Sequence, residues 1–225
     1  VGIVGAGAMG RGIAQIAAQA GSRVLLLDMQ VDAAASARSA IQAQWQRLQD
    51  KGRISPEQAT AWSSQLQTVA SVSDLAACDL VIEAIVERLD AKQALFTQLE
   101  AVVGPQVVLA TNTSSLAVTS IGAALKRPER LAGFHFFNPV PLMKVVEVIA
   151  GLKTTPAVCE ALADYARQMG HTPVRAQDTP GFIVNHAGRG FGTEALRIVS
   201  EGVADFATID RILRDQVGFK LGPFE

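Results

Sequence analysis

Short apolar runs alternate with longer stretches of helical periodicity along most of the chain. This alternation is typical of βαβ units around a parallel sheet, because a strand buried on both faces is apolar throughout. The expected strands are residues 1–4, 23–28, 79–84, 106–111, 131–137, 144–149 and 172–176. The expected helices are residues 9–20, 32–50, 91–103, 118–125 and 156–169. We therefore predict an α/β fold with a doubly wound, mostly parallel sheet.

The second predicted helix is followed by another helical stretch rather than by a strand. Ile41, Trp45 and Leu48 lie on one apolar stripe of residues 32–50. Residues 55–58, SPEQ, then form a capping box with proline at the first helical position. The pattern predicts a helical hairpin inserted after the second strand.

The pattern changes after Pro180. Residues 182–200 and 206–216 are predicted to be helices, with no strand between them. We place a domain boundary at Pro180, between residues 1–180 and residues 181–225. About 45 residues are too few to bury a good core alone. The second region is therefore expected to be the first part of a larger all-α domain.

Composition and charge exclude several classes of protein. Hydrophobic residues make up 49% of the chain and charged residues 18%, which excludes a disordered chain. A formal net charge of -1 predicts neither a nucleic-acid partner nor a charged membrane surface. No apolar run approaches the ~18 residues of a membrane-spanning helix. Cys78 and Cys159 lack metal-ligand spacing, so we expect reduced core cysteines in a cytoplasmic protein, and no metal site.

A glycine motif joins the first strand to the first helix. Gly5, Gly7 and Gly10 form GxGxxG. The first glycine permits a tight turn, the second lets a pyrophosphate approach the backbone, and the third lets helix and strand pack closely. The helix N-terminus, at Ala8 and Met9, adds amides and a positive dipole that favour phosphate. An ordinary glycine-rich turn is the alternative.

The end of the second strand gives this motif its context. Asp28 stands where a dinucleotide-binding unit needs a carboxylate for the ribose hydroxyls. The same carboxylate repels a 2′-phosphate, and Met29 and Gln30 offer no arginine to offset that repulsion. We therefore predict a site for NAD rather than for NADP.

A histidine and a carboxylate follow in neighbouring strands. His135 lies among phenylalanines, and Glu147 lies inside an apolar strand twelve residues later. An unpaired buried carboxylate is costly, so His135 is the expected partner of Glu147 across the turn. The pair would orient the imidazole and leave its other nitrogen to take a proton from a substrate hydroxyl. Separately, His135 could be a core histidine and Glu147 a charge on an edge strand.

Polar residues also follow two other predicted strands at the edge of the sheet where ligands collect. Ser114, in the segment 112–115, either donates to a substrate oxygen or caps the next helix. Glu87 and Lys92 follow the strand that ends at Ala84. They are either site residues or a surface ion pair on a helix.

Five segments, in this order and spacing, resemble the L-3-hydroxyacyl-CoA dehydrogenase family: GAGAMGRGIAQIAAQAG, VIEAIVE, NTSSLAVTSI, GFHFFNPVPLMKVVEVI and DTPGFIVN. The resemblance runs from Val1 to Glu225. It implies a Rossmann-type domain followed by a helical domain, with NAD-linked oxidation of the 3-hydroxyl of an acyl-CoA to a ketone. The expected substrate is short, such as 3-hydroxybutyryl-CoA. Bacterial members that act on 3-hydroxyadipyl-CoA in phenylacetate breakdown share much of this pattern.

The resemblance also implies roles for individual residues. His135 matches the general base, Glu147 the acid that orients it, and Ser114 and Asn185 the contacts to the substrate hydroxyl. Lys51, in the helical hairpin, matches a lysine near the CoA moiety. The predicted cofactor contacts are Gly5, Gly7, Ala8, Met9, Gly10, Asp28, Glu87, Lys92, Asn112, Ser114 and Asn138. The implied partners are an acyl-CoA substrate and a second copy of the chain, bound through the helical domain.

One position departs from the family pattern. His186 stands where the family commonly has an arginine after GFIVN. This difference concerns substrate preference more than chemistry. Two alternatives stay open: a dehydrogenase of a hydroxy acid or sugar acid without CoA, and a non-catalytic dinucleotide-binding protein on the same fold.

Overall fold

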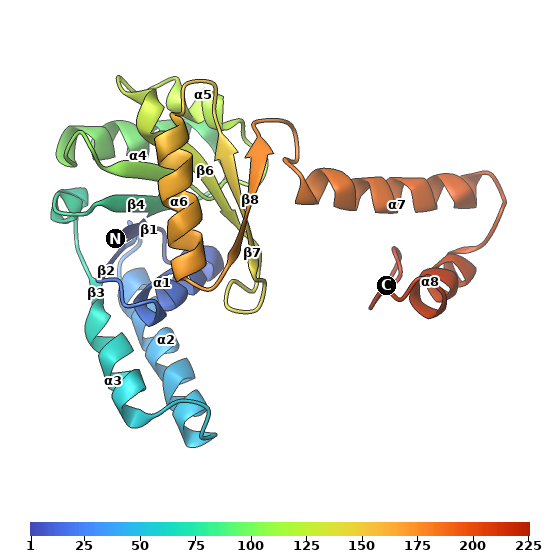
Figure 1. The fold of residues 1–225 in the computed structure, drawn as a ribbon, viewed down its shortest axis with the longest axis horizontal. Helices are drawn as coiled ribbons and strands as arrows, with labels where there is room; N and C mark the ends of the chain where they lie inside the picture. Colours follow the sequence, from blue (N-terminus) through green and yellow to red (C-terminus); the bar gives the residue numbers. More distant parts are fainter. The chain divides into compact units, whose positions relative to one another are not determined.

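An eight-stranded sheet forms the centre of residues 1–180 in the computed structural model, which describes residues 1–225 (Figure 1). The strand order is β3-β2-β1-β4-β5-β6-β7-β8, and only the β6–β7 pair is antiparallel. The strands are β1 (Gly2–Val4), β2 (Val24–Leu27), β3 (Leu66–Thr68), β4 (Leu80–Glu83), β5 (Val108–Thr111), β6 (Leu131–Phe136), β7 (Val145–Ala150) and β8 (Thr172–Gln177). The predicted doubly wound, mostly parallel sheet is confirmed.

Helices connect these strands. They are α1 (Ala8–Gln19), α2 (Ala33–Asp50), α3 (Pro56–Gln65), α4 (Leu89–Val102), α5 (Val118–Gly122) and α6 (Pro156–Gln168), with short 3₁₀ turns at Val72–Leu75 and Pro128–Arg130. The apolar faces of α1, α2 and α6 join the sheet in one buried cluster. In α1 this face combines Ile13 and Ile16 with the small residues Ala14 and Ala17.

The inserted hairpin consists of α2 and α3, which project from the sheet (Figure 1). Its predicted capping box is present: Gln58 N donates to Ser55 Oγ at 3.2 Å, and Ser55 N donates to Gln58 Oε1 at 2.9 Å. The sequence did not predict β3, which follows α3 directly and pairs with β2 at the edge of the sheet. Only Leu66 of this strand is fully buried, so three residues give no readable alternation.

The strand order changes direction at β1, which pairs with β2 on one side and β4 on the other. In open α/β sheets, ligands bind in the crevice outside the carboxyl ends of the strands at such a point. Register places Val4 beside Leu27 and beside Glu83, and Glu83 beside Thr111. The segments that leave these positions therefore meet at one edge.

Both cysteines of this region, Cys78 and Cys159, are buried and unpaired, as predicted. Burial raises the pKa of both thiols, which makes them poor nucleophiles. Every helix is too short or too polar to cross a lipid bilayer.

Residues 181–225 form a second compact unit, which contains α7 (Val184–Ser200) and α8 (Phe206–Asp215) and no strand. Aromatic pairs hold it together: Phe191 lies 5.1 Å from Phe219, and Phe206 lies 4.7 Å from Phe224, between ring centroids. Many large apolar side chains of this unit are exposed, namely Ile183, Val184, Leu196, Val203, Phe206, Ile212, Val217, Phe219 and Leu221.

Candidate active site

The glycine turn between β1 and α1 depends on close backbone contacts. Gly5 has a φ of +104°, and an added Cβ there would lie 2.3 Å from the Ala84 carbonyl oxygen. A Cβ at Gly10 would lie 1.8 Å from the Gly5 oxygen. Gly7 precedes α1, and a Cβ there would meet nothing within 4 Å. Because no side chain caps α1, the first amides of the helix suit an anion such as a pyrophosphate.

Asp28 is fixed beside this turn. Its Oδ2 accepts a hydrogen bond from Ala6 N at 2.7 Å, and its Oδ1 accepts one from Gln30 N at 2.8 Å. A cavity of about 640 Å³ opens at this point. It is lined by Gly5, Ala6, Gly7, Asp28, Met29, Gln30, Ala33, Ala84, Ile85 and Val86. Three features fit a dinucleotide. Gly7 leaves open space beside the turn, the N-terminus of α1 favours an anion, and the Asp28 carboxylate can accept hydrogen bonds from ribose hydroxyls.

His135 and Glu147 face each other across the antiparallel β6–β7 pair. His135 Nδ1 lies 2.7 Å from Glu147 Oε2, so the expected contact is present. The side chains are buried, since the two residues are 4% and 0% exposed. A carboxylate only accepts hydrogen bonds, so the proton of this bond belongs to Nδ1, and Nε2 is the nitrogen that would accept a proton.

The edge-strand alternative for Glu147 is wrong, because β7 lies between β6 and β8. Asn112 supports the neighbouring strand: its Oδ1 accepts a hydrogen bond from Phe136 N at 2.9 Å, one residue beyond His135. Asn138 follows β6 and is exposed, and its peptide bond to Pro139 is cis.

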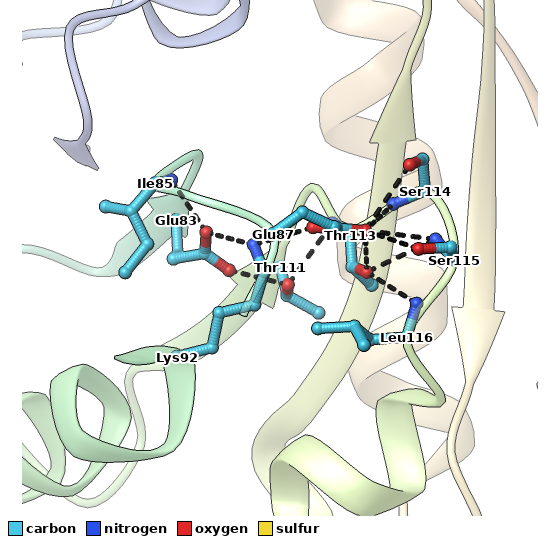
Figure 2. A network of polar contacts seen from close by, with 9 residues as sticks. All are labelled: Glu83, Ile85, Glu87, Lys92, Thr111, Thr113, Ser114, Ser115 and Leu116. Carbon is cyan, nitrogen blue, oxygen red and sulfur yellow. Dashed lines mark hydrogen bonds and ion pairs between the residues drawn. The ribbon is translucent and has the colours of Figure 1, made fainter. Parts of the chain in front are cut away.

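The loop after β5 is organised by one carboxylate, that of Glu87 (Figure 2). Its Oε1 accepts hydrogen bonds from Thr113 Oγ1 at 2.6 Å, Ser114 N at 2.8 Å and Ser115 N at 3.1 Å. The hydroxyls of Ser114 and Ser115 donate to the same oxygen at 3.3 and 3.1 Å. The helix-cap alternative for Ser114 is wrong, because α5 begins only at Val118 and has no side-chain cap.

These contacts set the charge of Glu87. Burial alone would raise its pKa, but the hydrogen bonds from Thr113 and Ser114 and the charge of Lys92 outweigh burial and lower the pKa to about 2. Glu87 is therefore a carboxylate at every ordinary pH. A charged acceptor holds these donors about twice as strongly as a neutral one would.

Lys92 is buried, so the surface-pair alternative is wrong. It is 1% exposed, and its Nζ lies 2.5 Å from Glu83 Oε1 and 3.2 Å from Glu87 Oε2. Glu83 completes this group and was not predicted from the sequence. A glutamate closing the apolar run LVIE was the available signal, since burial at that position demands a partner.

The remaining predicted residues lie elsewhere in the chain. Lys51 is exposed at the end of α2, in the turn of the hairpin. Asn185 is half-buried in the first turn of α7, within the second unit. Their roles in substrate binding stay predictions.

A parallel sheet that reverses its order at an open glycine turn defines a dinucleotide-binding protein of the Rossmann class. Sequence comparison is more specific. Residues 1–179 match the NAD binding domain of 3-hydroxyacyl-CoA dehydrogenase, and residues 181–225 match its C-terminal domain. The chain belongs to the 3-hydroxyacyl-CoA dehydrogenase family.

Individual relatives agree with this assignment. A 3-hydroxyadipyl-CoA dehydrogenase of Escherichia coli is 46% identical over 225 residues, which are 100% of this chain and 47% of that protein. A 3-hydroxybutyryl-CoA dehydrogenase of Bradyrhizobium diazoefficiens is 39% identical over 225 residues, 100% of this chain and 77% of that protein. The chain thus spans about half the length of the first relative and about three quarters of the second.

A solved structure gives the same result. The crystal structure of a 3-hydroxybutyryl-CoA dehydrogenase from Escherichia coli K12 matches with a TM-score of 0.96 and 46% identity. The match covers 99% of this chain and 47% of that one.

Proposed function

We propose that the protein catalyses the NAD-dependent oxidation of L-3-hydroxyacyl-CoA to 3-ketoacyl-CoA. The observation that carries this proposal is the buried hydrogen bond between His135 and Glu147 at the carboxyl edge of a sheet built for a dinucleotide. A neutral imidazole fixed by a carboxylate is a general base for an alcohol proton. Kinship with dehydrogenases of 3-hydroxyacyl thioesters supports the choice of substrate.

The cofactor would be held by the glycine turn and by Asp28. The amides at Ala8 and Met9 would bind the pyrophosphate, and the Asp28 carboxylate would accept hydrogen bonds from the ribose hydroxyls. When bound, NAD⁺ supplies the acceptor for the hydride that leaves C3 of the substrate. The likeness to the family supports further proposed cofactor contacts at Glu87, Lys92, Asn112, Ser114 and Asn138.

Different side chains would then act on different atoms of the substrate. His135 Nε2 takes the proton of the 3-hydroxyl, and Glu147 stabilises the imidazolium that forms. Asn185 and Ser114 would donate to the substrate oxygen as negative charge develops on it, and the Ser114 hydroxyl would exchange its 3.3 Å hydrogen bond to Glu87 for this one. Lys51 is proposed to contact the CoA moiety.

The proposal is tested by initial rates of NADH formation with the full-length protein. Acyl-CoA substrates are compared with the corresponding free 3-hydroxy acids. We expect turnover of the thioesters and little of the free acids. Turnover of free acids alone would favour the non-CoA dehydrogenase. NAD binding without any turnover would favour the non-catalytic alternative.

The acyl group is a separate question with two candidates. The short 3-hydroxybutyryl group is the sequence-based expectation, and relatives near 39% identity carry that name. A dicarboxylic 3-hydroxyadipyl group is favoured by the 46% identity to an enzyme named for it. The ratio of kcat/KM for the two thioesters decides between them. A homodimer and a cytoplasmic location stay predictions, testable by mass measurement in solution and by fractionation.

A further inference from the structure

Glu83 is a buried carboxylate to which the proposed chemistry gives no role. It ends β4 and is 0% exposed. Its register neighbours are Val4, just before the glycine turn, and Thr111, just before the loop that carries Ser114. A charge is tolerated at such a place only when donors or a cation replace its lost hydration. The partners of Glu83 therefore indicate what it does.

Both oxygens of Glu83 are bound (Figure 2). Its Oε1 accepts hydrogen bonds from Ile85 N at 2.7 Å and from Lys92 Nζ at 2.5 Å. Its Oε2 accepts one from Thr111 Oγ1 at 2.6 Å. Donors on both oxygens fix the rotation of the carboxylate, which in turn fixes the ammonium of Lys92.

Lys92 passes this constraint to Glu87. The ammonium lies 3.2 Å from Glu87 Oε2, while Oε1 of the same carboxylate binds the backbone of Ser114 and Ser115. Figure 2 shows the side chains in one row from Glu83 through Lys92 and Glu87 to the loop. With Oε2 turned toward Lys92, Oε1 is presented to the loop.

We propose that Glu83 is a positioning residue for Ser114, acting through Lys92 and Glu87. The proposal rests on the proposed function, because only there does Ser114 contact the substrate. The competing explanation is that Glu83 contributes to stability alone. The two explanations predict different results, because only the positioning role requires that the effect of Glu83 on kcat be transmitted through Ser114.

The substitution Glu83→Gln separates them, since it keeps the shape of the side chain and removes the charge. The ammonium of Lys92 is then attracted by Glu87 alone, which draws that carboxylate away from the loop. Glu100→Gln is a matched control. Glu100 lies on α4, the helix that carries Lys92. Its side chain is 10% exposed, and it accepts hydrogen bonds from Lys126 N and Arg127 N at 2.8 and 2.9 Å.

The first measurement is amide hydrogen exchange in the cofactor-free, full-length protein. In E83Q we expect the Ser114 and Ser115 amides to exchange about tenfold faster, the scale of one charged hydrogen bond. In E100Q the Lys126 and Arg127 amides should change instead. Unchanged exchange of the two serine amides in folded E83Q would overturn the proposal.

The second measurement is a double-mutant cycle in kcat with Ser114→Ala. E83Q should lower kcat about tenfold in the wild-type background and change it little when Ser114 is already lost. Any effect of E100Q should be the same in both backgrounds. Equal effects of E83Q in both backgrounds would show a structural role and contradict the proposal.

The proposed function and the positioning role of Glu83 can fail independently in these experiments. If the wild-type protein oxidises no 3-hydroxyacyl-CoA, the proposed function fails, and the exchange experiment still judges the coupling of Glu83 to the loop. If E83Q does not fold, Glu83→Asp keeps the charge and withdraws it from Lys92 by one methylene. The same exchange and kcat results are then expected of E83D.

Discussion

The glycine turn and the Glu87-bound loop lie at the same edge of one sheet, yet they are built in opposite ways. The turn is made of backbone from the first ten residues, and it works because side chains are missing. The loop after β5 is held by polar side chains from β4, from α4 and from the connection between them, which carries Glu87. His135 and Glu147 follow the second design, since their contact depends on the register of two strands.

This difference predicts that substitutions in the two regions affect different properties of the protein. In the turn, an added side chain either strikes the backbone, as at Gly5 and Gly10, or fills the open space beside Gly7, so damage appears first in folding or in cofactor binding. In the polar centre, a side chain can be replaced while the backbone stays, so damage appears first in turnover.

The largest effect is expected from His135→Ala. Removing the general base should lower kcat by roughly 10²–10⁴-fold. The glycine turn is untouched, so the dissociation constant of NAD should stay near that of the wild type. Steady-state rates and a direct NAD titration check this, with E100Q as a buried-site control. Near-normal turnover would remove His135 from the chemistry.

Glu147→Gln should cost less than His135→Ala. Glutamine keeps the volume but loses the charge that orients the imidazole and stabilises its protonated form. A hydrogen bond to a charged group contributes about 1.5–3 kcal/mol, so kcat should fall about tenfold to a hundredfold. Rates should be compared in both variants at one pH. A loss in Glu147→Gln as large as that in His135→Ala would indicate that the carboxylate takes part in proton transfer directly.

The turn is tested by a pair of glycine substitutions. Gly10→Ala places a Cβ 1.8 Å from the Gly5 oxygen, so we expect a loss of about 1–3 kcal/mol in the free energy of unfolding. Gly7→Ala meets no atom within 4 Å, so stability should stay unchanged while NAD binds about tenfold more weakly. Urea unfolding and NAD titration check the pair. Equal stability losses would contradict this division of roles.

The smallest effect concerns the charge of Glu87. Its pKa is about 2 in the folded protein, below its ordinary value of 4.5. The unfolded chain therefore binds this proton first as pH falls. The contribution to stability is complete above pH 4.5 and is lost toward pH 2, and water screens it because the side chain is 35% exposed.

Glu87→Gln isolates this contribution. The difference in the free energy of unfolding between wild type and E87Q should be constant near neutral pH and shrink below pH 4.5. Urea unfolding at a series of acidic pH values measures it. A difference that changes between pH 6 and 8 would contradict the assignment.

Local patterns were enough to predict most of the fold. The apolar runs and the capping box at Ser55 indicated strands and helices close to those observed. A strand buried on both faces is a continuous apolar run, and a helix buried on one face has apolar residues at helical spacing. The strand β3 was not predicted, because three residues are too few to show any period. The His135–Glu147 contact was predictable, since consecutive strands joined by residues 137–144 carry the pair.

The Glu83–Lys92–Glu87 group was not predictable in the same way. In the sequence Glu87 and Lys92 look like a surface pair on a helix, and nothing local shows that Lys92 is buried against Glu83 at the end of β4. Ser114 likewise looked like a helix cap in the sequence, because its contact with Glu87 forms only in the folded chain. Its partner Glu87 lies 27 residues earlier in the chain, beyond the reach of any local pattern.

Local sequence patterns specify the α/β alternation, the backbone turn that suits a dinucleotide and the residue types available for acid–base work. These depend on neighbours within about one turn or strand of the chain. Which charges are buried, and which donors satisfy them, is settled in the folded chain. Those outcomes depend on strand order and register, which bring segments far apart in the chain together and let their polar groups replace the water they lose.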